Sequence, residues 1–247
     1  MQNADGAAGH AFSWRNGKLT LLPSLGGKNS GASAINEHGQ IVGSAETRFP
    51  DAAGYDTSHA VMWEKGRIRD LKVPAKNHSG ALGINNKGEV VCMAVNTGLP
   101  ILNGVDTATN RCFLWRKGNL TDVGEAGVHT VPRAVNDSGT IVADVSNNLL
   151  FLWRDGSRHN VQMPPGTDVF LTSAINSAGQ CVGTLQVKGR VFAFVYRDGQ
   201  LYDLNALTPG SGWNLYRANA INERGQIVGM GKFRGRDRGF LLTPITR

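Results

Sequence analysis

Two histidines occupy the same place in a pattern that recurs along this sequence. His78 and His129 each lie seven residues before a recurring asparagine. Imidazoles that converge from neighbouring repeats, with Glu125 close to the second one, are suited to acid–base catalysis or to metal binding. The competing interpretation is a pair of surface or capping histidines. The sequence offers no third and fourth metal ligand and no hydrolase, zincin, Walker or dinucleotide motif, so we predict neither a metal nor a cofactor.

The positive charge is concentrated near the C-terminus. From residue 188 to residue 247 there are ten basic and four acidic residues, which accounts for most of the net charge of +7. Neighbouring repeats place equivalent links side by side, so two basic links are predicted to form one patch for acidic glycans, phosphates or other anions. A solubilising face is the alternative, and the fold signatures of nucleic-acid-binding domains are missing. The cations of the two links are Lys188, Arg190, Lys232, Arg234, Arg236 and Arg238.

Three segments depart from the repeat and are candidates for ligand contacts, because function on a repeat scaffold concentrates in such segments. Trp213 and Tyr216 lie in a non-repeat loop and are predicted to form an exposed stacking surface. One long insertion carries Arg48, Tyr55 and Asp56, and another runs from residue 96 to residue 110. A lid over a ligand site is one interpretation of the insertions, and a solvated loop without function is the other.

A four-part block positions all of these residues. It reads H-A-F-x-W, then L-x-D-L, then A-I-N-x-x-G, then Q-I-V-G, with copies of the first part at His10, His59, Arg111, Leu149 and Phe192 and a weaker one at Arg238. The glycines of the third part follow one another at intervals of 49, 51, 40 and 46 residues. Each part is short, β-branched or aromatic, and bounded by turn residues, which is typical of strands joined by tight hairpins.

The composition agrees with this interpretation. Glycine makes up 32 of 247 residues, about 13% against the usual ~7%, which favours a chain rich in turns. A repeat of roughly 45 residues with four antiparallel strands has the size of a propeller blade. We therefore predict one all-β domain over residues 1–247, a five-bladed β-propeller, with six blades as the less favoured count. The predicted repeats span residues 10–58, 59–110, 111–148, 149–190 and 191–237, with a closing strand at 238–242.

The block resembles the HAF-repeat family of bacterial, probably extracellular, repeat proteins. The resemblance rests on HAFSW, on A-I-N-x-x-G-Q-I-V-G at residues 34–43 and 220–229, and on the closing RGFLLTP, and it covers residues 9–244. It implies a propeller-like fold and an extracellular or periplasmic location, and it supplies no catalytic residues. The chain begins without a signal-peptide pattern, which keeps a cytoplasmic location open, and it has no apolar run long enough for a membrane helix.

We expect a non-catalytic, lectin-like binding propeller for a polar or acidic glycan or another anionic small molecule. An enzyme with its site in the mouth of the ring, under the two long insertions, is one alternative, and a scaffold for a protein partner is another. The odd number of cysteines, Cys92, Cys112 and Cys181, without C-x-x-C spacing predicts free buried thiols.

Overall fold

The computed structural model describes residues 9–49, 57–75, 78–96, 109–124, 128–145 and 149–245. In these ranges every regular element is a β-strand, and the strands pair almost entirely in antiparallel fashion. None of the described residues belongs to a helix that is long and apolar enough to cross a membrane. The chain divides into two compact units, residues 1–132 and 133–247, which are described separately below.

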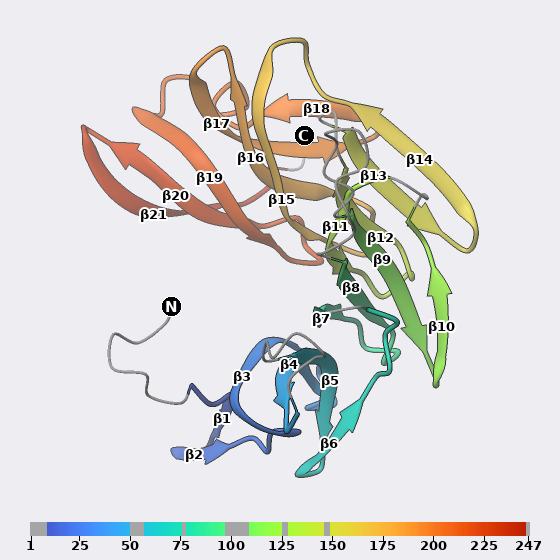
Figure 1. The fold of residues 1–247 in the computed structure, drawn as a ribbon. Coiled ribbons are helices and arrows are strands. Elements are labelled where there is room, and N and C mark those ends of the chain that lie inside the picture. The colour runs from blue at the N-terminus through green and yellow to red at the C-terminus, as the bar shows by residue number, and fades with distance from the viewer. Residues whose placement is uncertain are drawn as a thin grey trace. The chain divides into compact units, whose positions relative to one another are not determined.

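The first unit contains a hairpin and two four-stranded meanders (Figure 1). The hairpin pairs β1 with β2, the first meander runs from β3 to β6, and the second runs from β7 to β10. A short parallel contact between Ser58 and His78 joins the two meanders. The strands are β1 (Phe12–Arg15), β2 (Lys18–Leu21), β3 (Gly26–Ile35), β4 (Ile41–Thr47), β5 (Ser58–Glu64), β6 (Arg67–Asp70), β7 (His78–Ile84), β8 (Val90–Asn96), β9 (Thr109–Arg116) and β10 (Asn119–Asp122).

The second unit contains two four-stranded meanders and a three-stranded sheet, and the first half of β11 lies before its boundary. The sheets β15–β18 and β19–β21 lie side by side in Figure 1 and contact each other through β16, β17 and β19. The strands are β11 (Thr130–Val135), β12 (Ile141–Val145), β13 (Leu149–Arg154), β14 (Ser157–Gln162), β15 (Thr167–Ile175), β16 (Cys181–Val187), β17 (Arg190–Arg197), β18 (Gln200–Asp203), β19 (Trp213–Ile221), β20 (Ile227–Phe233) and β21 (Arg236–Leu242).

The sheets differ from the sequence repeat in phase. The predicted repeats begin at the aromatic strand, whereas each meander begins at the A-I-N strand and ends at the L-x-D-L strand. The physical reason lies in the links between strands. The tight turns, and also the link between β16 and β17, join strands that pair in antiparallel register within one sheet. The link between β18 and β19 instead connects two different sheets. Each four-stranded meander therefore combines the second half of one repeat with the first half of the next.

The hairpins have the tight turns that the sequence predicts. Asp198 and Gly199 have φ angles of 51° and 77°, and Arg234 and Gly235 have φ angles of 48° and 78°. Two successive positive φ angles define a type I′ turn, whose twist matches that of the flanking strands. These turns fix which residues of adjacent strands face each other, and thus which side chains share a face.

The aromatic residue that ends the first part of the repeat packs against the preceding meander. Trp115 on β9 belongs to the same buried cluster as Met62 and Leu71. Tyr196 on β17 is packed in the same way with Val142 and Leu152. The repeat thus contributes one large ring to each of these two interfaces between neighbouring sheets, and burial of that ring is a large part of what holds the sheets together.

The three cysteines are free and buried, as the sequence predicts. Burial raises the pKa of the Cys92 thiol to about 12 and that of the Cys181 thiol to about 12, with the Asp144 carboxylate adding to the effect on Cys181. Burial also raises the pKa of Cys112. These thiols therefore stay protonated at neutral pH and serve as small apolar groups in the core.

Candidate functional site

The β20–β21 hairpin is the most positively charged feature of the second unit. Lys232, Arg234, Arg236 and Arg238 are all exposed, and within the described ranges no ion pair forms at any of them. Asp237 is the one acidic residue of the hairpin, and it accepts a hydrogen bond of 3.2 Å from the Tyr216 hydroxyl. Four cations and one carboxylate on two short strands leave a local excess of positive charge in contact with solvent.

The predicted stacking residue Trp213 lies on the same hairpin sheet. Its ring centroid is 5.1 Å from that of Phe233 and 6.4 Å from that of Phe240. Trp213 pairs with Phe233 across the strands, and Phe233 pairs with Arg236, so these three residues share one face of the sheet. The Arg234 guanidinium lies over the Phe233 ring at 5.3 Å. The fold thus joins Trp213 and Phe233 with Arg234, Arg236 and Arg238 into one aromatic and cationic surface, the basic hairpin surface. Lys232 and its partner in the register, Asp237, are on the opposite face of the sheet, where Asp237 also accepts the bond from Tyr216.

The first basic link has a different environment. Arg190 forms an ion pair of 2.7 Å with Asp203 and lies over the Phe192 ring. The pairing neutralises its charge, so Arg190 adds little to a surface for anions. Lys188 is exposed at the tip of the β16–β17 turn, and the aliphatic part of its side chain lies beside Gly166.

Arg238 remains free of such a pair because of its place in the repeat. The corresponding residues of earlier copies are His59 and Arg111, which pair with Asp70 and Asp122 on the fourth strand of their meanders. The β19–β21 sheet has three strands, so no L-x-D strand stands beside β21 in this sheet. Arg238 therefore has no carboxylate partner among the described residues, and its guanidinium donates to the Asp237 carbonyl at 2.9 Å.

The two predicted histidines have repeat-equivalent contacts. The Nδ1 atom of His78 lies 3.3 Å from both the backbone nitrogen and the hydroxyl of Ser58, at the start of β5. The Nε2 atom of His129 lies 3.4 Å from the amide nitrogen of Asn110, near the start of β9. Each imidazole thus contacts the residue that directly precedes the first part of a repeat copy, Ser58 before His59 and Asn110 before Arg111. The described residues contain no group of three or more His, Cys, Asp or Glu side chains suited to a metal.

The other predicted site residues are divided between described and undescribed segments. Arg48 follows β4, and its guanidinium lies 5.9 Å from the Phe49 ring centroid. Tyr55, Asp56 and Glu125 lie outside the described residues. Arg48 belongs to the first unit, and the basic hairpin surface belongs to the second.

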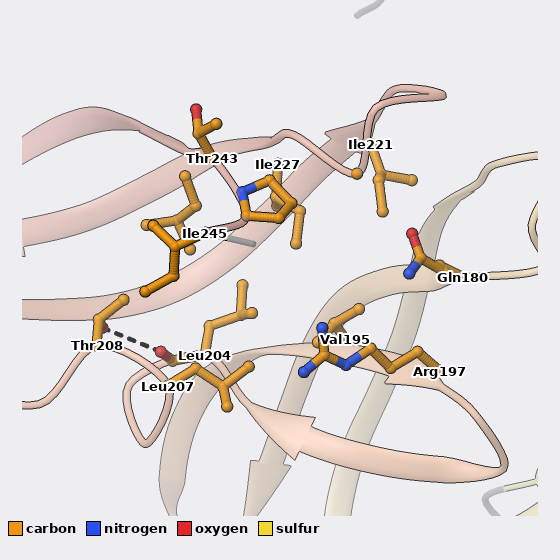
Figure 2. A pocket seen from close by; sticks show the side chains of 13 residues that line it. Gln180, Val195, Arg197, Leu204, Leu207, Thr208, Ile221, Ile227, Thr243 and Ile245 are labelled. Atoms are coloured by element: carbon orange, nitrogen blue, oxygen red, sulfur yellow. Dashed lines mark hydrogen bonds between the residues drawn. The ribbon is translucent and has the colours of Figure 1, made fainter. Parts of the chain in front are cut away.

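A cavity of about 480 Å³ lies at the opposite end of the β19–β21 sheet from the basic hairpin (Figure 2). Its walls are mostly apolar and come from β17, the residues after β18, β19, β20 and the segment after β21. Arg197 is its cationic side chain, and Figure 2 shows the guanidinium directed into the cavity near Leu204. Leu207 and Ile245, at the mouth, are 43% and 84% exposed.

This cavity is not among the sites predicted from the sequence, although the sequence contains a signal for it. The aromatic position of the repeat holds Trp14, Trp63, Trp115, Trp153 and Tyr196, and in the last copy it holds Leu242. A repeat residue that becomes smaller at one site predicts either local repacking or a gap. The RGFLL segment at residues 238–242 is a weaker copy of the first part of the repeat because it lacks this ring.

Comparison with known proteins identifies the type of fold. No protein-family model and no curated protein matches the sequence. Among solved structures, the chain is similar to the β-propeller domain of the Trilobed protease from Pyrococcus furiosus, with a TM-score of 0.60 and 12% identity, over 90% of this chain and 69% of that one. It is also similar to a prolyl endopeptidase structure, with a TM-score of 0.58 and 10% identity, over 93% of this chain and 38% of that one. At such low identity the likeness shows the fold alone: the chain has a β-propeller fold built from antiparallel sheets.

Proposed function

We propose that this protein is a non-catalytic binding propeller that uses the basic hairpin surface to hold an acidic glycan. The observation that carries the proposal is the placement of Arg236 and Arg238 on the same sheet as the Trp213–Phe233 pair, with no carboxylate paired to either arginine in the described part of the chain. Aromatic faces bind the apolar face of a sugar ring, and arginines bind carboxylate or sulfate groups through two parallel hydrogen bonds.

The spacing of the hairpin suits a chain of charged sugars better than a single ion. Adjacent residues of a strand advance by about 3.3 Å, so Arg236 and Arg238 lie about 7 Å apart along β21. Successive anionic groups of a polyuronic acid can therefore meet successive arginines while one sugar ring lies over the aromatic pair. A polynucleotide would need several stacking platforms, and this sheet offers one.

The test is a titration with oligogalacturonate, and with a neutral oligosaccharide of the same length, at low and moderate salt. We expect binding of the acidic chain alone, weakened by salt because exposed charges are screened within about 10 Å at 0.1 M. The variant R234Q/R236Q/R238Q should lose this binding, and Trp213→Ala should weaken it. Arg224→Gln, in the β19–β20 turn of the same sheet, is the matched control and should bind normally.

Equal binding by the triple variant and the parent protein would refute the proposal. Binding of single-stranded DNA in preference to the acidic glycan would also refute it, because the surface would then select phosphate and bases.

Three further statements belong to the same proposal. The four four-stranded meanders, with the three-stranded sheet and the two-stranded hairpin as the remaining strands, support a closed ring of five blades, which a crystal structure would count directly. The HAF-repeat motifs at residues 34–43 and 220–229 support membership of that family. Export would suit an acidic glycan as ligand, and fractionation of producing cells would test the location.

A further inference from the structure

The cavity beside Leu242 lies at the place where the repeat puts an aromatic ring. Leu242 pairs with Ile227 across β20 and β21, as Tyr196 pairs with Cys181 across β16 and β17. Both residues are therefore at the same register position of their sheets and point toward the preceding sheet. Tyr196 belongs to a cluster with residues of that preceding sheet, whereas Leu242 is only half-buried at the edge of the corresponding cluster.

The wall opposite Leu242 has kept its form. Met62 and Leu71, which pack with Trp115 in the first unit, correspond in the repeat to Val195 and Leu204. Val195 and Leu204 are buried and line the cavity. The repeat surface that packs against an indole elsewhere is thus present here without the indole. The volume of the cavity, about 480 Å³, lies within the range of small-molecule sites.

The charge of the cavity defines the rest of the ligand. The Arg197 guanidinium lies 5.2 Å from the Tyr202 ring centroid, and no carboxylate of the described residues pairs with it. The hydroxyl of Thr208 donates to the Leu204 carbonyl at 3.0 Å, and the hydroxyl of Thr243 lies 3.3 Å from the Gln226 amide nitrogen. Arg197 is therefore the charged group of the lining with donors to spare for an anion.

We infer that this cavity binds an aromatic carboxylate, whose ring takes the place of the missing repeat side chain while its carboxylate pairs with Arg197. A ring between Val195, Leu204 and Leu242 would bury its faces against aliphatic carbons. A carboxylate two or three bonds from the ring would lie on the Arg197 side, where the guanidinium points into the cavity (Figure 2). The exposed Leu207 and Ile245 would cover part of the ring at the mouth.

The test uses indole-3-propionate as the probe and its neutral alcohol analogue as the comparison, with calorimetry and NMR titration as readouts. For a ligand of this size we expect a Kd of about 1 mM or tighter. Arg197→Gln should weaken the acid at least tenfold and leave the weak binding of the alcohol unchanged. Leu242→Trp should abolish binding of both compounds, because the protein's own indole would fill the space, and should raise the Tm.

Arg236→Gln is the control, because it removes a cation at the other end of the sheet, and it should bind the probe normally. This control separates the cavity from the acidic-glycan surface, so either proposal can fail alone. Equal affinity for the acid and the alcohol would overturn the inference about Arg197. Unchanged binding by a folded Leu242→Trp protein, or no binding at several millimolar probe, would overturn the assignment of the cavity.

Discussion

The recurring asparagine offers a sharp test of how the sheets hold together. Asn176 is 1% exposed, and its amide group donates to the Gln180 side chain at 2.8 Å and to the Asn222 carbonyl of the next sheet at 3.2 Å. Its side-chain oxygen accepts from the Gln180 backbone at 3.0 Å. The same link between sheets recurs from Asn36 to Asn85 and from Asn136 to Asn176. Asn176→Ala removes all three bonds of Asn176 at once.

The expected magnitude follows from those contacts. A net contribution of about 1 kcal/mol for each bond predicts a loss of up to about 3 kcal/mol in the free energy of unfolding, because the bonds form around a buried side chain, although Gln180 is only half-buried. Asn222 is the matched control. It makes three local bonds, to Gln226 and to the Arg224 backbone, but it is exposed, so water replaces them when it is removed. Asn222→Ala should therefore cost about 1 kcal/mol or less.

Urea unfolding followed by circular dichroism measures the difference. With an m-value of about 2–3 kcal/mol/M, Asn176→Ala should lower the midpoint by about 1 M, and Asn222→Ala by a few tenths at most. Equal shifts for the two variants would refute the reasoning, because the inter-sheet bond and the burial would then contribute nothing beyond the local turn.

Two other predictions concern titratable groups, one half-buried carboxyl and three buried thiols. Burial raises the pKa of the Asp70 carboxyl, but hydrogen bonds from His59 and Lys72 outweigh it and leave the pKa below the usual 3.8. The stabilisation of about 1 kcal/mol that Asp70 provides should thus be complete above pH 4 and should vanish as the pH falls through the lowered pKa, so the parent and Asp70→Asn should converge in acid. None of the thiols of Cys92, Cys112 and Cys181 should react with a thiol reagent at pH 8 in the folded protein, whereas all three should react in denaturant. A thiol that reacts fast in the folded protein would contradict their burial.

The local features of the fold could be predicted from the sequence. Alternating aromatic and β-branched residues indicate strands, and a glycine after a turn residue indicates a type I′ hairpin, because both depend on a few adjacent residues. The five recurring copies also predict a propeller-like scaffold of four-stranded sheets. Free, buried cysteines follow from their number and spacing.

The sequence does not show which strands pair across the variable links, and the structure was needed to establish this pairing. The sequence predicts blades that begin at the aromatic strand, but hydrogen bonding groups the strands one hairpin later. The glycine of the I-V-G part is a second example. A Cβ at Gly183 would collide with the Leu171 carbonyl, which approaches where the β15 register shifts between Thr172 and Ala174. That bulge is a property of two paired strands, so one strand alone does not reveal it.

The candidate sites divide in the same way. The sequence by itself determined which residues carry charge or a ring: Trp213, the cations of residues 232–238, and the leucine at position 242 in place of an aromatic residue. Only the tertiary structure decided that Arg190 is paired with Asp203 while Arg238 is not, and that Trp213 lies beside Phe233. It also decided that the space beside Leu242 faces Arg197. The physical reason is that charge and ring identity belong to single residues, whereas neutralisation, stacking and an unfilled volume depend on which neighbouring strand and sheet stand opposite.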